Sequence, residues 1–116
     1  MTAADTNTEA ALHLLPAQRA LVSSLLARHL PGTTVRAFGS RVAGWPGSRG
    51  VIKPQSDLDL ALDLCGRPAD LALALALALL RADLDDSDLP WRVDLCLLDE
   101  LPETLRELIA RHGVPL

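Results

Sequence analysis

The segment Asp57–Leu64 alternates acidic or small residues with leucine, which gives it a period of two. Successive side chains of a β-strand point to opposite faces, so such a segment separates its residues into two sets. One face is entirely leucine, and the other carries Asp57, Asp59, Ala61 and Asp63. The pattern predicts a strand whose leucine face lies on a hydrophobic core and whose other face presents carboxylates.

Helices are predicted on both sides of this segment. Pro16 suits the first turn of a helix with apolar residues at helical spacing, and Pro31-Gly32 ends it. Leu71–Leu79 alternates leucine with alanine as a strand would. Both residue types are strong helix formers and β-branched residues are absent, so we predict a helix that opens at Pro68 and fades in the acidic run Asp83–Asp88.

Two further strands and a last helix complete the predicted elements. Thr33–Phe38 is rich in β-branched residues and leads into a loop over Arg41–Ser56, and Trp91–Leu97 follows a Leu-Pro turn. A last helix begins at Asp99 or Leu101 and ends at Gly113. The order predicts an α+β fold, a small mixed sheet with helices packed on it. We expect residues 1–10 to be a flexible leader and residues 11–116 to form one domain.

Composition excludes several functions. A formal net charge of −4 argues against direct nucleic-acid binding, which depends on Lys and Arg contacts with phosphates. The apolar run Leu71–Leu80 is too short to cross a bilayer, and the first residues lack the pattern of a signal peptide. Cys65 and Cys96 have no zinc-site spacing, so reduced thiols are expected. These features favour a soluble cytoplasmic protein.

Asp57 and Asp59 are the residues whose placement most needs an explanation. Like charges on one strand face repel each other, and a bound Mg²⁺ ion would reverse that cost, because it prefers oxygen ligands and accepts one or two carboxylates. A solvated strand face is the plainer interpretation of this pair alone. Asp94, however, lies within a second predicted strand between Val93 and Leu95, and Asp is depleted from strand interiors. If the strands are neighbours, the three carboxylates converge.

Gly39-Ser40-Arg41 follows the first predicted strand directly. Glycine allows the backbone to approach a phosphate, the following amides and the Ser40 hydroxyl can donate hydrogen bonds, and Arg41 can pair with a terminal phosphate. Taken alone, a Gly-Ser pair after a strand is an ordinary turn. It becomes a candidate nucleotide site because the carboxylates follow it.

Together these motifs resemble the nucleotidyltransferase superfamily of DNA polymerase β, and most closely its minimal nucleotidyltransferase (MNT) branch. The resemblance runs over nearly the whole chain from the first helix. It is carried by the segments Ala37–Gly44, Ser56–Leu62, Leu89–Leu95 and Leu108–Leu116. One departure is the loop between Ser40 and Asp57, which is longer than the family pattern.

The resemblance implies both a site and an activity. Asp57 and Asp59 would hold two Mg²⁺ ions with ATP, Asp94 would complete the metal site and help activate an acceptor hydroxyl, and Gly39 and Ser40 would hold the triphosphate. MNT proteins of this kind resemble the antitoxin of HEPN/MNT toxin–antitoxin pairs, which implies transfer of AMP to a partner HEPN toxin.

Two alternatives stay open at this point. One is a binding-only antitoxin or regulatory subunit with a vestigial site. The other is a small-molecule nucleotidyltransferase of the aminoglycoside type, although such enzymes usually carry a further helical domain. The sequence does not decide between a homo-oligomer and a hetero-oligomer, nor does it identify the acceptor residue.

Overall fold

The computed structural model describes residues 12–48 and 56–116 of the 116-residue chain. The described residues form a mixed four-stranded sheet in the order β3-β2-β1-β4. The strands are β1 Thr34–Phe38, β2 Leu58–Asp63, β3 Val93–Leu97 and β4 Val114–Pro115. β2 pairs antiparallel with β1 and parallel with β3, which confirms the predicted mixed sheet. The expected leader, residues 1–10, lies outside the described residues.

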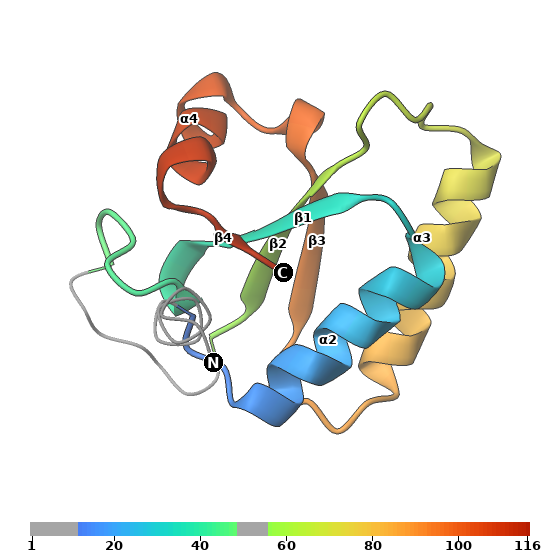
Figure 1. Cartoon of the computed structure of the whole chain (residues 1–116), viewed down its shortest axis with the longest axis horizontal. Helices are drawn as coiled ribbons and strands as arrows, with labels where there is room; N and C mark the ends of the chain where they lie inside the picture. The colour runs from blue at the N-terminus through green and yellow to red at the C-terminus, as the bar shows by residue number, and fades with distance from the viewer. Residues whose placement is uncertain (1–11, 49–55) are drawn as a thin grey trace.

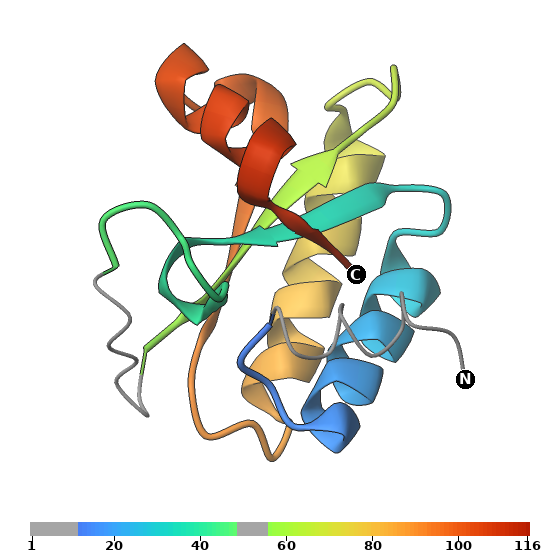
Figure 2. The same ribbon diagram turned by 60° about the vertical axis from the view of Figure 1, so that its left-hand side comes forward.

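Helices cover both faces of the sheet. They are α2 Pro16–His29, α3 Leu71–Asp85 and α4 Glu103–His112, with short 3₁₀ turns η1 Gly39–Arg41 after β1 and η2 Leu98–Glu100 after β3. α2 and α3 lie together on one face and α4 lies on the other (Figures 1 and 2). His29 Nε2 lies 2.5 Å from Asp83 Oδ2 and joins α2 to α3. None of the described helices has the length and apolar character to cross a membrane.

Local sequence signals set the ends of the helices. Pro16 occupies the first turn of α2, where its missing N–H costs no helical hydrogen bond. Asp70 caps α3, because its Oδ1 accepts the N–H of Leu73 at 3.0 Å. α4 ends at Gly113, whose N–H donates to the carbonyl of Ile109 at 2.8 Å. The predicted helices are therefore confirmed, with shifts of a few residues at their ends.

The alternating leucines of α3 divide between two sides of the helix. Leu73, Leu77, Leu80 and Leu84 recur at helical spacing and are buried against the sheet and α2. Leu71, Leu75 and Leu79 are spaced four residues apart on the other side and are 85%, 58% and 50% exposed. A strand would have placed all the odd-numbered leucines on one face, so helix propensity prevailed over the period-two pattern.

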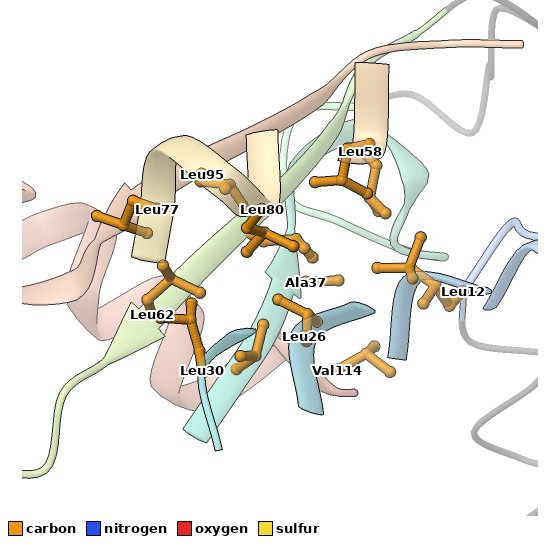
Figure 3. Close-up of a cluster of buried hydrophobic side chains, with 14 of the residues drawn as sticks. Leu12, Leu26, Leu30, Ala37, Leu58, Leu62, Leu77, Leu80, Leu95 and Val114 are labelled. Atoms are coloured by element: carbon orange, nitrogen blue, oxygen red, sulfur yellow. The ribbon is translucent and has the colours of Figure 1, made fainter. Parts of the chain in front are cut away.

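The main core lies between the leucine face of β2 and helices α2 and α3. Leu58, Leu60 and Leu62 are at most 1% exposed. Figure 3 shows Leu62 of β2 among Leu77 and Leu80 of α3 and Leu30 at the end of α2. A smaller cluster of Phe38, Ala61 and Ile109 lies on the opposite face, beneath α4.

β4 is an element that the sequence analysis missed. Its two residues pair with β1, with Ala37 opposite Val114 and Arg36 opposite Pro115. This segment has no extended alternating pattern, and proline is tolerated only because β4 is an edge strand. The pairing ties the end of the described chain to the strand that leads into Gly39-Ser40.

Candidate active site

The strand register places Asp59 and Asp94 side by side. Asp59 of β2 is directly opposite Asp94 of β3 in the parallel pairing, and on its other side it is opposite Phe38 at the end of β1. Directly opposite residues of neighbouring strands share a face of the sheet. Both carboxylates therefore lie on the face that carries α4. Asp57 is one residue before β2 and is exposed.

The electrostatics of Asp59 reflect this crowding. Burial, the negative charge of Asp94 and that of Asp57, in decreasing order of effect, together raise the pKa of Asp59 to about 6. The carboxylate is half-buried, so water compensates its charge only in part. A cation at this position would relieve the repulsion and return the group to its ionised form.

Gly39 and Asp59 are in direct contact across the two strands. Gly39 has a φ of +82°, a left-handed conformation that favours glycine. A Cβ atom at this position would lie 2.5 Å from Asp59 Oδ2, closer than any ordinary contact. The predicted phosphate-binding turn and the predicted metal ligand thus adjoin each other. Ser40 follows in η1 and is half-buried.

Arg41 occupies a different environment from the one expected. Its side chain is 5% exposed, Nε donates to the carbonyl of Ser56 at 2.7 Å, and Nη1 donates to the carbonyl of His13 at 2.9 Å. The guanidinium Cζ lies 4.4 Å from the ring centroid of Trp91. Burial lowers the pKa of Arg41, and the charge of Asp57 opposes this effect. These contacts favour a structural role over the expected contact with phosphate.

The described part of the long loop packs back on the sheet. Trp45 has its ring centroid 6.2 Å from that of Phe38 and 6.2 Å from that of His112. Val42 forms a β-bridge with Leu12. Residues 49–55 of the loop, which include Arg49 and Lys53, lie outside the described residues.

Known proteins similar to this chain agree with the nucleotidyltransferase resemblance. No protein-family model matches the chain. A Haemophilus influenzae protein named "Probable protein adenylyltransferase MntA" is 39% identical over 102 residues, which cover 88% of this chain and 81% of that protein. The chain belongs to the minimal nucleotidyltransferases. A solved structure described as a minimal nucleotidyltransferase superposes with a TM-score of 0.58 at 37% identity, covering 86% of this chain and 90% of the other.

Few side chains of this nucleotidyltransferase could hold a metal ion at the candidate site. Among residues 12–48 and 56–116, no three His, Cys, Asp or Glu side chains are grouped closely enough to hold an ion by themselves. Mg²⁺ usually binds proteins through one or two carboxylates and takes its remaining ligands from water and substrate phosphates. The hard oxygen donors of Asp59 and Asp94, with Asp57 nearby, fit a cation that arrives with a nucleotide.

Sequence reasoning predicted the candidate carboxylates but missed the contacts that hold the segment before β2, where Asp57 lies. The contacts of Arg41 with Ser56, His13 and Trp91 link segments that are far apart in the chain. The only signal in the sequence was an arginine next to the predicted nucleotide-binding turn, and that position suggests a phosphate ligand as readily as a structural residue. Only the burial of Arg41 distinguishes a structural role from a phosphate-binding role, and burial depends on the tertiary structure.

Proposed function

We propose that this nucleotidyltransferase transfers AMP from ATP to a hydroxyl group of a partner protein and requires Mg²⁺. The observation that carries the proposal is the contact between Gly39 and Asp59, with Asp94 opposite Asp59 in the sheet. Gly39 of the predicted phosphate-binding turn is thus adjacent to two of the predicted carboxylates. Protein adenylylation is also the activity in the name of the Haemophilus influenzae relative.

Each residue has a distinct part in the proposed reaction. Asp57 and Asp59 would hold the Mg²⁺–triphosphate complex, and the backbone amides and hydroxyl of Gly39-Ser40 would donate hydrogen bonds to its phosphates. When bound, the ion would supply neutralisation of the charge on the phosphate oxygens. Asp94 would complete the metal site and accept the proton of the acceptor hydroxyl. The hydroxyl oxygen attacks the α-phosphorus, the bond to the bridging oxygen breaks, and pyrophosphate leaves.

A HEPN toxin is the proposed partner, and the chain would then act as its antitoxin. The resemblance of Ala37–Gly44 and Ser56–Leu62 to the MNT branch, whose small members resemble the antitoxins of HEPN/MNT pairs, supports this partner. The negative net charge of the chain also agrees with a protein acceptor better than with a nucleic acid. Modification of a toxin would neutralise it without a permanent complex.

The test is incubation with ATP, Mg²⁺ and the product of a gene that neighbours the gene for this chain, followed by measurement of the intact mass of that product. We expect a gain of one AMP that requires Mg²⁺ and is lost in Asp59→Asn. Asp63→Asn is the matched control, because Asp63 lies on the same strand face and its Oδ1 accepts the N–H of Cys65 at 3.0 Å, a bond that asparagine can keep. Toxin neutralisation that survives Asp59→Asn would instead support a binding-only antitoxin.

A further inference from the structure

β3 forms an open edge of the sheet next to the site. It is at the end of the strand order, and among the described residues only β2 pairs with it (Figure 1). The N–H of Leu58 donates to the carbonyl of Arg92 at 2.9 Å. The alternation of a parallel ladder then turns the N–H and C=O groups of Val93, Leu95 and Leu97 toward the outer edge. Such a row of groups is a template for another strand.

A groove accompanies this edge. It has a volume of about 420 Å³ and lies between α3 and η2. Its apolar lining includes Leu77 of α3, Leu95 and Leu97 of β3, and Leu101 after η2. Arg81 and Glu100 also line the groove and are both exposed. A peptide bound in this groove would contact apolar side chains and one residue of each charge beside the edge of β3.

We propose that the acceptor segment of the partner protein binds in this groove as an additional, antiparallel strand on β3. The inference rests on the proposed function and specifies how its substrate is recognised. Backbone hydrogen bonds to an edge strand give affinity, and alternate side chains give specificity. The recognised chemistry is an extended peptide with apolar side chains at alternate positions.

The register explains how such a peptide would reach the reaction site. Because Asp94 directs its backbone groups toward β2, a residue opposite it on the outer edge forms a non-hydrogen-bonded antiparallel pair. Cβ atoms of directly opposite residues are about 4.5–5.5 Å apart and on the same face. A serine, threonine or tyrosine opposite Asp94 would therefore present its hydroxyl to that carboxylate, which is directly opposite Asp59 on the inner side.

The exposed leucines of α3 are a weaker docking candidate. Leu71, Leu75 and Leu79 point away from the sheet, because the buried leucines of the helix occupy the opposite side. A partner bound there would not place a hydroxyl beside Asp94. Binding at this surface is therefore an alternative outcome of the test.

The experiment uses a synthetic peptide in which valine alternates with serine. Added to the ¹⁵N-labelled full chain, it should shift the amide signals of Val93, Leu95 and Leu97, and it should do so in Asp59→Asn as well, because docking needs no chemistry. With Mg²⁺ and ATP labelled at the α-phosphate, the wild-type chain should label serine. N-methylation of the valines removes the donors that face β3 and should abolish binding, whereas N-methylation of the serines should not.

The same groove can also be tested by changing the protein instead of the peptide. Glu100→Trp places a large side chain at the groove and should weaken peptide binding about tenfold, which corresponds to about 1.4 kcal/mol. Glu107→Trp is the control, because Glu107 is also exposed but lies on α4, away from the groove residues.

The outcomes separate the two proposals. Labelled serine without shifts on β3, equal behaviour of the two N-methylated peptides, or shifts confined to Leu71, Leu75 and Leu79 would overturn docking on β3 and leave the transferase proposal intact. Shifts on β3 without any AMP on serine would overturn transfer to a protein hydroxyl, whereas strand addition would stand.

Discussion

The carboxylate of Asp59 lies against the backbone of Gly39, with Oδ2 at 2.5 Å from the position that a Cβ atom would take. This contact joins the end of β1 to the acidic face of β2. Glycine is therefore required at position 39 both because Asp59, the proposed metal ligand, leaves no room for a Cβ atom and because the turn has a positive φ.

Gly39→Ala should reduce the rate of AMP transfer far more than Gly44→Ala does, whereas the two variants should lose similar stability. The added methyl group would displace the Asp59 carboxylate, and a shift of about 1 Å at a reacting group can cost about 100-fold in rate. Gly44→Ala is the matched control, because Gly44 also has a positive φ, +71°, but no atom lies within 4 Å of its added Cβ. Both variants should lose about 1–2 kcal/mol of unfolding free energy from backbone strain. Equal transfer rates in the two variants would contradict the prediction.

The stability of the metal-free protein should depend on the ionisation of Asp59. Its pKa is raised from 3.8 to about 6, so the folded state binds the proton more tightly than the unfolded state does. This contribution is fully present below pH 3.8 and is lost as the pH rises through about 6. Urea unfolding with EDTA should show the wild type losing stability relative to Asp59→Asn across this interval. A difference that does not change with pH would exclude a raised pKa.

Arg41→Lys should mainly destabilise the fold. Lysine keeps the charge but cannot donate to both the Ser56 and His13 carbonyls in the planar geometry of a guanidinium. An unsatisfied buried acceptor costs about 1–3 kcal/mol, so we expect a loss of that size in urea unfolding. Arg28→Lys, at an exposed position of α2, serves as the control and should change little. A higher KM for ATP in Arg41→Lys at unchanged stability would instead support a contact between Arg41 and a phosphate of ATP.

The leucines of α3 should separate into two classes on substitution by alanine. Leu73→Ala removes a side chain that is 1% exposed and should cost about 2–5 kcal/mol of unfolding free energy. Leu75→Ala, at a position 58% exposed, should change stability by less than about 0.5 kcal/mol. Thermal and urea unfolding of both variants provide the measurement. Equal losses would contradict the helical arrangement.

The sequence by itself determined the local elements and the candidate carboxylates. The period of two over Asp57–Leu64 predicted β2 and its acidic face, and Pro16 and Gly113 marked helix ends. The resemblance in Ala37–Gly44 and Ser56–Leu62 also indicated the family, which the relatives confirm. These signals are readable because they depend on residues within a few positions of each other.

Only the tertiary structure decided which distant residues meet. The parallel register of β2 and β3 set Asp94 opposite Asp59, and burial placed Arg41 on the carbonyls of Ser56 and His13. β4 is too short to have a pattern of its own and exists through its pairing with β1. Each of these features depends on contacts between separate segments, whose energies no local pattern of residues encodes.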